Sequence, residues 1–477
     1  MQVQLPEVDI FDPATIARCM RSLPVNTDSY KASHDEQYPE GTEFLFYNVE
    51  SRGGKYDETV VIGPQMYAME YLTQQVTLEQ VAFAAKFFAM HGEPFSANRW
   101  LRLIEKYDGY LPLEVRSVPE GTIMPYKQVI ATVVNTDPEF FWVDIETSLL
   151  RGVWYPTTVA SQSYKIRKVI KSYLEKSGDV GGLGFKLHDF GARGVSSFES
   201  AAIGGAAHIL SGAMGSDTVS GVLQVMRYYK PKSLPAYSIP AAQHSTTTIL
   251  GKQGESDQFA LMVEKLAKRG GLFAVVSDGF DIDEACEKWG TAPLKDMVIA
   301  SGATLVVRPD SGHPATIVLR CLQTLAKGYG FTMNDKGYKV LNNVRVIQGD
   351  GICEESIIEI LDTALAAGFS ADNIAFGMGG ALLQQINRDT NKFAMKLSAA
   401  CINGNWVDVF KDPKTDPGKK SKKGRVMAVK NLNGEWESIR QEDFNAAAYS
   451  DQIRTIFKDG KMVVEDDMET IRARCAL

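Results

Sequence analysis

Hydrophobic and polar positions alternate with two different periods along residues 1–157, and strands and helices are therefore expected in mixed order there. Apolar and β-branched runs predict strands, whereas apolar residues three or four positions apart predict helices. The expected strands are 43–49, 59–62, 113–118 and 129–134, and the expected helices are 64–75, 78–90, 96–107 and 139–154. The last of these is rich in aromatic residues, which favours a core or subunit-interface helix over a ligand box.

From about residue 158 the pattern becomes strand, glycine-bearing turn and helix, repeated about six times. The expected strands are 185–190, a short one ending at 238–240, then 272–276, 304–308, 344–347 and 374–376, with helices such as 314–327 and 354–367 between them. Alternation of this length predicts right-handed βαβ units and a parallel sheet. Roughly six units favour a barrel over an open sheet.

Short strands return near the end of the chain, at 406–410, 425–429 and 436–439. We expect this segment to fold with the N-terminal region. The predicted organisation is a β-rich α+β domain built from residues 1–157 and 393–477, and an α/β barrel domain of residues 158–392.

Composition narrows the class of protein. A net charge of −7 over 477 residues gives no global attraction to nucleic acid or to an anionic membrane. The six cysteines are widely spaced and form no CxxC pair, which argues against a zinc site and a disulfide framework and suits a reducing cytosol. Residues 1–20 lack the apolar region of a signal peptide, and no apolar run approaches the length of a membrane span. We therefore expect a cytoplasmic enzyme.

The strand 304–308 ends on an informative sequence, Arg308-Pro309-Asp310-Ser311-Gly312. Proline fixes one backbone dihedral and lacks the amide hydrogen that a sheet needs, so the strand must stop there. Arg308 and Asp310 would form either an ion pair that only caps the strand or part of a catalytic site. The second interpretation follows from the carboxyl ends of parallel strands, where α/β proteins place their chemistry.

Every other expected barrel strand also ends in glycine or charged residues. These strand ends are 188–194, 240–245, 277–281, 348–351 and 377–380. If the sheet closes, their side chains face one mouth. Asp310 and Asp350 would accept hydrogen bonds from ribose hydroxyls, because ionised carboxylates only accept. A lone histidine such as His244 is more often structural than catalytic, and Asp281 is a plausible orienting partner for it.

Two segments suggest phosphate binding. The turn 377–380 opens into the expected helix 381–386, whose free backbone amides suit a phosphate, although the turn also fits a simple tight connector. Arg388, expected two turns into that helix, and Lys396 in the next strand would add positive charge. The basic run 411–425 indicates either a polyphosphate site or a solvated loop, and its lack of interleaved aromatics argues against a nucleic-acid platform.

Eight motifs, taken together, are highly specific. They are Thr27-Asp28-Ser29-Tyr30-Lys31, Lys186-Leu187-His188-Asp189-Phe190-Gly191, Arg193-Gly194-Val195-Ser196-Ser197, Gly215-Ser216-Asp217-Thr218-Val219, His244-Ser245-Thr246, Arg308-Pro309-Asp310-Ser311-Gly312, Val346-Ile347-Gln348-Gly349-Asp350-Gly351 and Ser421-Lys422-Lys423-Gly424-Arg425. On these motifs the chain resembles the nicotinamide phosphoribosyltransferases over nearly its whole length. The resemblance implies an irregular α/β barrel of the type II phosphoribosyltransferase kind, a second β-rich domain, and a homodimer with active sites at the subunit interface.

The resemblance also implies the reaction. Nicotinamide and phosphoribosyl pyrophosphate would give nicotinamide mononucleotide and pyrophosphate, with magnesium, in NAD salvage. ATP would be a co-substrate that is hydrolysed through a phosphohistidine and improves the equilibrium. The magnesium ligands are not identified by any motif.

Residue roles follow from the same resemblance, position by position. Phe190 of one subunit and Tyr30 of the other would stack on the pyridine ring. Asp217 would accept the carboxamide N–H, with Arg308 and Ser277 nearby. The ribose and its 5′-phosphate would meet Asp310, Gly349, Asp350, Gly379, Gly380, Arg388 and Lys396. The pyrophosphate or ATP phosphates would meet Arg52, Arg193, Lys411 and Lys419. His244 would be the phosphorylated residue, assisted by Asp281, with Arg308 and Asp310 completing the catalytic group.

Three positions depart from the family pattern. Gln243 stands where an acidic residue is usual, which would weaken coupling to ATP. A short loop after Arg52 points to a microbial or viral relative, and Ala192 replaces a tyrosine at the pocket edge. The nearest alternative is a nicotinate phosphoribosyltransferase, against which Asp217 argues because a carboxylate repels the carboxylate of nicotinate. A barrel aldolase would need a lysine or a metal cluster at the strand ends, and a non-catalytic binding protein would lack one of the charged ends.

Overall fold

The structure is a computed structural model that describes residues 4–267, 271–415 and 420–477. The chain divides into two compact units. The first contains the chain up to Ser161 together with Asn387–Arg474, and the second contains Gln162–Ile386 and the last three residues. The domain boundaries expected from the sequence, 157/158 and 392/393, lie a few residues from these divisions.

An antiparallel sheet of seven strands forms the centre of the first unit. Its strands, in spatial order, are β15 (Asn405–Asp408), β14 (Phe393–Ile402), β1 (Thr42–Ser51), β5 (Val129–Asn135), β3 (Leu113–Ser117), β19 (Arg454–Lys458) and β20 (Lys461–Met462). Strand β1 pairs with β14 on one side and β5 on the other, so segments from both ends of the chain share this sheet. Two smaller sheets belong to the same unit, one of β17 (Trp436–Arg440), β16 (Val426–Asn431) and β18 (Tyr449–Asp451), the other of β2 (Glu58–Val60) and β4 (Ile123–Pro125).

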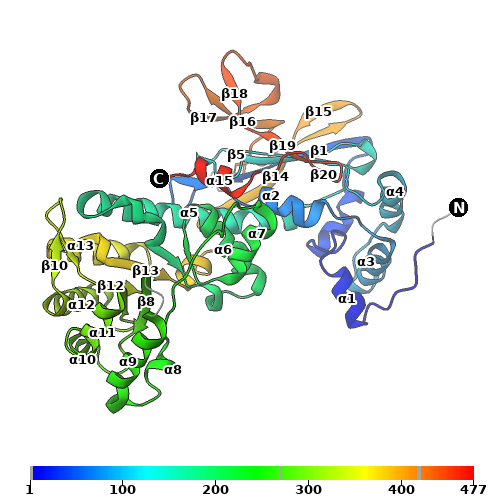
Figure 1. The fold of residues 1–477 in the computed structure, drawn as a ribbon. Helices are drawn as coiled ribbons and strands as arrows, with labels where there is room; N and C mark the ends of the chain where they lie inside the picture. Colours follow the sequence, from blue (N-terminus) through cyan, green and yellow to red (C-terminus); the bar gives the residue numbers. More distant parts are fainter. Residues whose placement is uncertain (1–3, 268–270, 416–419) are drawn as a thin grey trace. The chain divides into compact units, whose positions relative to one another are not determined.

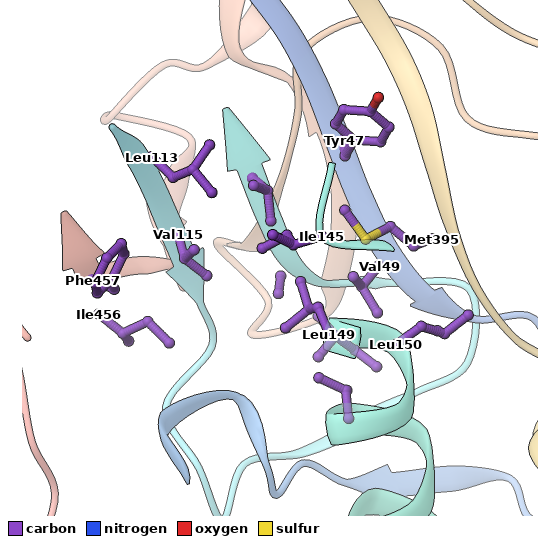
Figure 2. Packing of buried hydrophobic residues seen from close by; sticks show 14 of the residues in the cluster. Tyr47, Val49, Leu113, Val115, Ile145, Leu149, Leu150, Met395, Ile456 and Phe457 are labelled. Carbon is purple, nitrogen blue, oxygen red and sulfur yellow. The ribbon is translucent and has the colours of Figure 1, made fainter. Parts of the chain in front are cut away.

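Apolar side chains from this large sheet and from the start of a long helix make the core of the first unit. Figure 2 shows Val49, Val115, Leu149, Met395 and Phe457 gathered in this cluster. Helices α1 (Pro13–Cys19), α2 (Pro64–Tyr67), α3 (Leu78–His91), α4 (Ala97–Tyr107) and α15 (Met468–Arg474) complete the unit. Helix α3 begins at a capping box, because Thr77 and Gln80 exchange side-chain and backbone hydrogen bonds.

Six parallel strands form the sheet of the second unit. Their spatial order is β7 (Gly215–Ser216), β6 (Leu187–Asp189), β13 (Ile374–Met378), β12 (Val344–Gln348), β9 (Ala303–Arg308) and β8 (Gly271–Val276). The segment 237–241 pairs with both edges, since Tyr237 bridges Gly215 and Ala241 bridges Ala274, each in parallel. The sheet thus closes on itself, and the predicted α/β barrel is confirmed.

Side chains from around the sheet fill the interior of the barrel. Ala274, Val306 and Ile347 are buried together, and Phe190, Ile239 and Ala375 pack against them. Helices surround the strands, as the green-to-yellow part of Figure 1 shows. They are α6 (Phe198–Leu210), α7 (Val219–Tyr229), α8 (His244–Thr247), α9 (Glu255–Leu266), α10 (Ile282–Trp289), α11 (Leu294–Ser301), α12 (Pro314–Tyr329) and α13 (Glu354–Ala366), and a hairpin of β10 (Phe331–Met333) and β11 (Lys339–Leu341) follows α12.

Three predicted helices differ from the structure. The helix expected at 64–75 is α-helical only in α2, and it continues as a π-helix over Ala68–Leu72, where it ends. The helix expected at 139–154 is α5 (Glu146–Ser177), which begins later and continues through Pro156 across the division between the units. Its start is set by Asp144, whose carboxylate accepts a hydrogen bond from the Glu146 amide. The helix expected at 381–386 is only the short turn α14 (Gly380–Leu383). Arg388 therefore does not lie on it, and instead begins a 3₁₀ turn, Arg388–Thr390, in the first unit.

No helix among the described residues combines the length and the apolar character that crossing a membrane requires.

Candidate active site

The charged end of strand β9 lies at the mouth of the barrel. Arg308 Nη2 is 3.1 Å from Asp310 Oδ2, so the two side chains that flank Pro309 form an ion pair. Both are partly exposed, at 24% and 26% of their side-chain surface. The charges are therefore held in a fixed arrangement while their outer surfaces stay open to a ligand.

His244 lies on helix α8, immediately after the segment that closes the barrel. Its Nε2 is 2.9 Å from Asp278 Oδ1, and its Nδ1 is 4.0 Å from Asp310 Oδ2. The other oxygen of Asp278 accepts hydrogen bonds from the Asp310 amide at 3.0 Å and from the Ser311 hydroxyl at 2.6 Å. One carboxylate thus joins His244 to the loop after β9.

The orienting partner of His244 predicted from the sequence, Asp281, is corrected by this geometry. Asp281 accepts hydrogen bonds from the amides of Asp283 and Glu284 and caps helix α10. Asp278 takes the orienting role because it directly follows strand β8 and faces the mouth. The signal was present in the sequence, since Asp278 is the acidic residue nearest to that strand end.

The ionisation of Asp278 fixes the chemistry of the imidazole. Burial opposes ionisation, but the hydrogen bonds from Ser311, His244 and the Asp310 amide outweigh it, so the pKa of Asp278 lies below its ordinary value. An ionised carboxylate only accepts hydrogen bonds. The proton of a neutral His244 ring therefore lies on Nε2, and Nδ1 carries the lone pair.

Phe190 forms an aromatic surface at the end of strand β6. Its ring lies on Gly377, where an added Cβ would be only 1.9 Å from a ring carbon, and beside Gly349, where an added Cβ would be 3.4 Å away. The preceding residue, Asp189, is fully buried and accepts a hydrogen bond from the Gly191 amide at 2.7 Å. Burial raises the pKa of Asp189 to about 6. The glycines thus leave room for a ring that a larger residue would displace.

Asp217 follows the adjacent strand, β7, and is exposed. Its amide donates a hydrogen bond to the Asp189 carbonyl at 2.9 Å, which ties it to the strand that ends in Phe190. Its carboxylate accepts a hydrogen bond of 2.5 Å from the Ser238 hydroxyl in the closing segment. An aromatic surface and an oriented acceptor therefore occupy neighbouring strand ends.

Ser277 was predicted to lie with Phe190 and Asp217 at the nicotinamide site, but the structure places it elsewhere. It is fully buried, donates a hydrogen bond to the Val275 carbonyl at 3.0 Å, and accepts one from the Trp289 indole at 3.0 Å. Alternation along a strand explains the difference, because Ser277 points towards helix α10.

Glycine turns complete the mouth. An added Cβ on Gly379 would lie 3.6 Å from the Phe190 carbonyl oxygen, and one on Gly194 would lie 3.3 Å from the Gly380 backbone. The exposed Arg193 precedes Gly194, so the structure brings this cation close to the turn before α14. Asp350 is exposed as well, and its backbone carbonyl accepts a hydrogen bond from the side-chain amide of Gln348 at 3.0 Å.

Four predicted phosphate-binding residues lie together in the first unit. They line an open cleft of about 660 Å³, whose walls are Arg52, Glu146, Leu150, Arg388, Asp389, Lys392, Phe393, Ala394, Lys396 and Lys411. Five of these side chains are cationic and two are anionic. Lys392 was missed by the sequence reasoning, although it lies midway between Arg388 and Lys396.

A chain of ion pairs supports this cleft. Lys396 is 3.2 Å from Glu146, and Glu146 is 2.9 Å from Lys31, which also pairs with Asp144 at 2.8 Å. Burial disfavours the charge on Lys31, but the two carboxylates outweigh it and raise its pKa above the ordinary value. Burial likewise opposes ionisation of Glu146, yet Lys31 and Lys396 lower its pKa. Tyr30, next to Lys31, is 56% exposed and available for stacking.

The predicted residues therefore form two groups, the barrel mouth in the second unit and the basic cleft in the first. The predicted pyrophosphate residue Lys419 lies outside the described residues. Among the described residues, no three His, Cys, Asp or Glu side chains gather as a metal-binding cluster.

Two family models match the chain. Residues 185–461 match the nicotinate phosphoribosyltransferase (NAPRTase) family, and residues 22–115 match the nicotinamide phosphoribosyltransferase N-terminal domain. A crystal structure of nicotinate-nucleotide pyrophosphorylase from Pyrococcus furiosus has a similar fold, with a TM-score of 0.60 and 17% identity, covering 99% of this chain and 97% of that one.

The match to the NAPRTase family model identifies the chain as a pentosyltransferase, and its barrel is of the type II phosphoribosyltransferase kind. A nicotinamide phosphoribosyltransferase of Xanthomonas campestris is 47% identical over 95% of this chain and 97% of its own length. A second, of Acinetobacter baylyi, is 28% identical over 96% and 97%. The chain belongs to the nicotinamide phosphoribosyltransferase family, as the motifs at the strand ends predicted.

Proposed function

We propose that this protein joins nicotinamide to phosphoribosyl pyrophosphate and forms nicotinamide mononucleotide and pyrophosphate. The observation that carries this proposal is the placement of Asp217 beside Phe190. The ring of Phe190 offers a stacking surface for a flat heterocycle, and the carboxylate of Asp217 accepts hydrogen bonds only. A carboxamide N–H satisfies that acceptor, whereas the carboxylate of nicotinate is repelled by it.

The reaction breaks the bond between the ribose C1 and pyrophosphate and forms a bond from C1 to the pyridine nitrogen. Positive charge develops on the sugar and negative charge on the leaving group, so fixed cations near the phosphates lower the barrier. Arg52 and Lys411 are suited to that role, and Arg388 and Lys396 are suited to hold the 5′-phosphate of the ribose. No general base is required, because the pyridine nitrogen has no proton to lose. Stacking on Phe190 orients that nitrogen towards C1.

The proposed reaction also uses a magnesium ion. Mg²⁺ is usually held by one or two carboxylates together with substrate phosphates, rather than by a complete protein cage. The partly exposed Asp310 and the exposed Asp350 fit that mode of binding. When bound, the ion supplies charge neutralisation at the leaving pyrophosphate.

The proposal includes ATP as a co-substrate. Nδ1 of His244 would attack the γ-phosphorus of ATP, and the N–P bond would form while the bond to the bridging oxygen breaks and ADP leaves. The hydrogen bond from Nε2 to Asp278 supports this assignment, since it leaves the lone pair on Nδ1. Gln243 donates a hydrogen bond to the Ser245 hydroxyl at 2.6 Å, at a position where a carboxylate would add charge beside His244.

We also propose a homodimer whose active sites combine residues from both subunits, with Tyr30 and the basic cleft of one subunit serving the barrel mouth of its partner. Helix α7 supports an interface, because Val219, Leu223 and Met226 share one face and are 68%, 54% and 47% exposed. The six free cysteines suit action in a reducing cytoplasm, in the salvage of NAD precursors.

Purified protein tests this function directly. Nicotinamide mononucleotide should form from nicotinamide and phosphoribosyl pyrophosphate, faster with ATP than without it, and nicotinate should react far more slowly. A preference for nicotinate would instead support a nicotinate phosphoribosyltransferase, and absence of either product would refute the proposal. Measurement of the molar mass in solution checks the dimer.

A further inference from the structure

The basic cleft of the first unit contains one cation to which no motif assigns a role. Lys392 lines the cleft between Arg388 and Lys396, and its side chain is exposed. Its position is unusual because φ is +47°, in the left-handed region that residues with a Cβ rarely adopt. Some feature of the structure must therefore hold the backbone there.

Three hydrogen bonds from one neighbouring segment hold this turn. The Lys55 amide donates to the Thr390 carbonyl at 3.0 Å, and the Arg52 amide donates to the Lys392 carbonyl at 3.2 Å. Between them, the Ser51 hydroxyl donates to the Asn391 carbonyl at 2.6 Å. Three consecutive carbonyls thus point towards the end of β1. This arrangement fixes the direction in which the Lys392 side chain projects from the backbone. Strained backbone conformations of this kind cluster at binding sites.

The charge balance of the cleft is positive. Its acidic residues already have partners, because Glu146 pairs with Lys31 and Lys396, and Asp389 pairs with Arg388. Among the residues that the structure describes, no carboxylate lies within ion-pair distance of Lys392 or Lys411. The buried Nη2 of Arg52 likewise has no hydrogen-bond acceptor among them. The cleft can therefore accept a ligand with several negative charges.

We propose that Lys392 is a further substrate-binding residue, which donates hydrogen bonds to phosphate oxygens of phosphoribosyl pyrophosphate. The inference rests on the proposed function for the identity of this substrate. The chemical class of the ligand, a phosphorylated group with two or more negative charges, follows from the cleft itself. Lys392 would act on binding, because it lines the basic cleft to which the phosphates of the substrate are assigned.

Two substitutions separate charge from backbone conformation. Lys392→Asn removes the charge and keeps the left-handed turn, which asparagine tolerates well. Lys392→Arg keeps the charge. Lys230→Asn is the matched control, because Lys230 also has a positive φ, of 40°, and lies after helix α7, outside the cleft. All three variants should fold, which thermal unfolding checks.

Calorimetry with inorganic pyrophosphate is the primary measurement, because it needs no turnover. Lys392→Asn should weaken pyrophosphate binding about tenfold, the usual effect of losing one charge-assisted hydrogen bond. Its KM for phosphoribosyl pyrophosphate should rise by a similar factor, and the KM for nicotinamide should stay unchanged. Lys392→Arg and Lys230→Asn should resemble the unchanged protein, and added salt should reduce the difference.

Unchanged pyrophosphate affinity in a folded Lys392→Asn variant would overturn this inference. Equal weakening in Lys230→Asn would do the same, since it would show a general effect of net charge. A protein that binds pyrophosphate through Lys392 but makes no nicotinamide mononucleotide would refute the proposed function and leave the role of Lys392 intact.

Discussion

Substitution of Gly377 by alanine provides a direct test of the aromatic surface at the barrel mouth. The new Cβ would lie 1.9 Å from one carbon of the Phe190 ring, whereas ordinary contact begins near 3.4 Å. The ring must therefore move by about 1.5 Å, the difference between the two distances. The three heavy atoms nearest to the new Cβ all belong to that ring, so the side chain can rotate away while the strand stays in place.

The expected effect is on nicotinamide. Loss of the stacking contact is worth about 0.5–1.5 kcal/mol, which corresponds to a rise in the nicotinamide KM of roughly two- to tenfold. A ring displaced by more than 1 Å also orients the pyridine nitrogen poorly, and such misplacement costs about a hundredfold in rate. Steady-state kinetics with each substrate varied should show a large fall in kcat/KM for nicotinamide and little change in the KM for phosphoribosyl pyrophosphate.

Two further variants complete this experiment. Gly182→Ala is the control, because a Cβ there makes only an ordinary contact at 3.8 Å. In a Phe190→Ala background, Gly377→Ala should add almost nothing, since the ring that it displaces is already absent. A folded Gly377→Ala variant with unchanged nicotinamide kinetics, or effects of the two substitutions that simply add, would refute the reasoning.

Three other predictions concern acidic residues at the mouth. Asp278→Asn should lower ATP hydrolysis on the order of a hundredfold or more, because an amide can donate to His244 Nε2 and favour the wrong tautomer; synthesis without ATP should persist, and intact ATPase activity would contradict the assignment. Asp217→Asn should reduce the preference for nicotinamide over nicotinate about tenfold or more in competition kinetics, and an unchanged ratio would show that another residue selects the amide. Asp189 has a pKa of about 6 when folded, above its ordinary 3.8, so its burial costs stability as pH rises from 4 to 6, by about 3 kcal/mol in total. Urea unfolding should show Asp189→Asn gaining stability over the unchanged protein across that range, and a pH-independent difference would refute this cause.

The sequence was sufficient to predict the barrel because its strands carry a strong local signal. The run 304–308 is apolar and stops at a proline, and the structure places β9 over Ala303–Arg308. The closing segment 237–241 was visible only as a short strand end, because it forms two isolated bridges rather than a ladder. Helix α5 was the largest error, since packing of residues on both sides of Pro156 overrides the tendency of proline to end a helix.

Side-chain partners were harder to predict than strand ends. Asp278 and Asp281 both follow strand β8, and only the direction of each side chain decides which one reaches His244. Ser277 illustrates the same limit. It directly precedes Asp278, but its hydroxyl points into the core, because successive side chains along a strand point to opposite faces. Lys392 was missed for a different reason. Its importance depends on a left-handed turn and on neighbours from residues 51–55, which no local pattern reveals.

The two groups of residues differ in how their charges are balanced, and this difference suits the two substrates. At the mouth, the carboxylates of Asp217, Asp278, Asp310 and Asp350 outnumber the cations Arg193 and Arg308, so a neutral ring such as nicotinamide is favoured over an anionic one. In the cleft, cations exceed acids, which suits a phosphorylated sugar. Substitutions at Gly377 should therefore alter kinetics for nicotinamide, whereas substitutions at Lys392 should alter kinetics for phosphoribosyl pyrophosphate. A variant that raised both KM values equally would indicate that its residue contacts the atoms where the two substrates join.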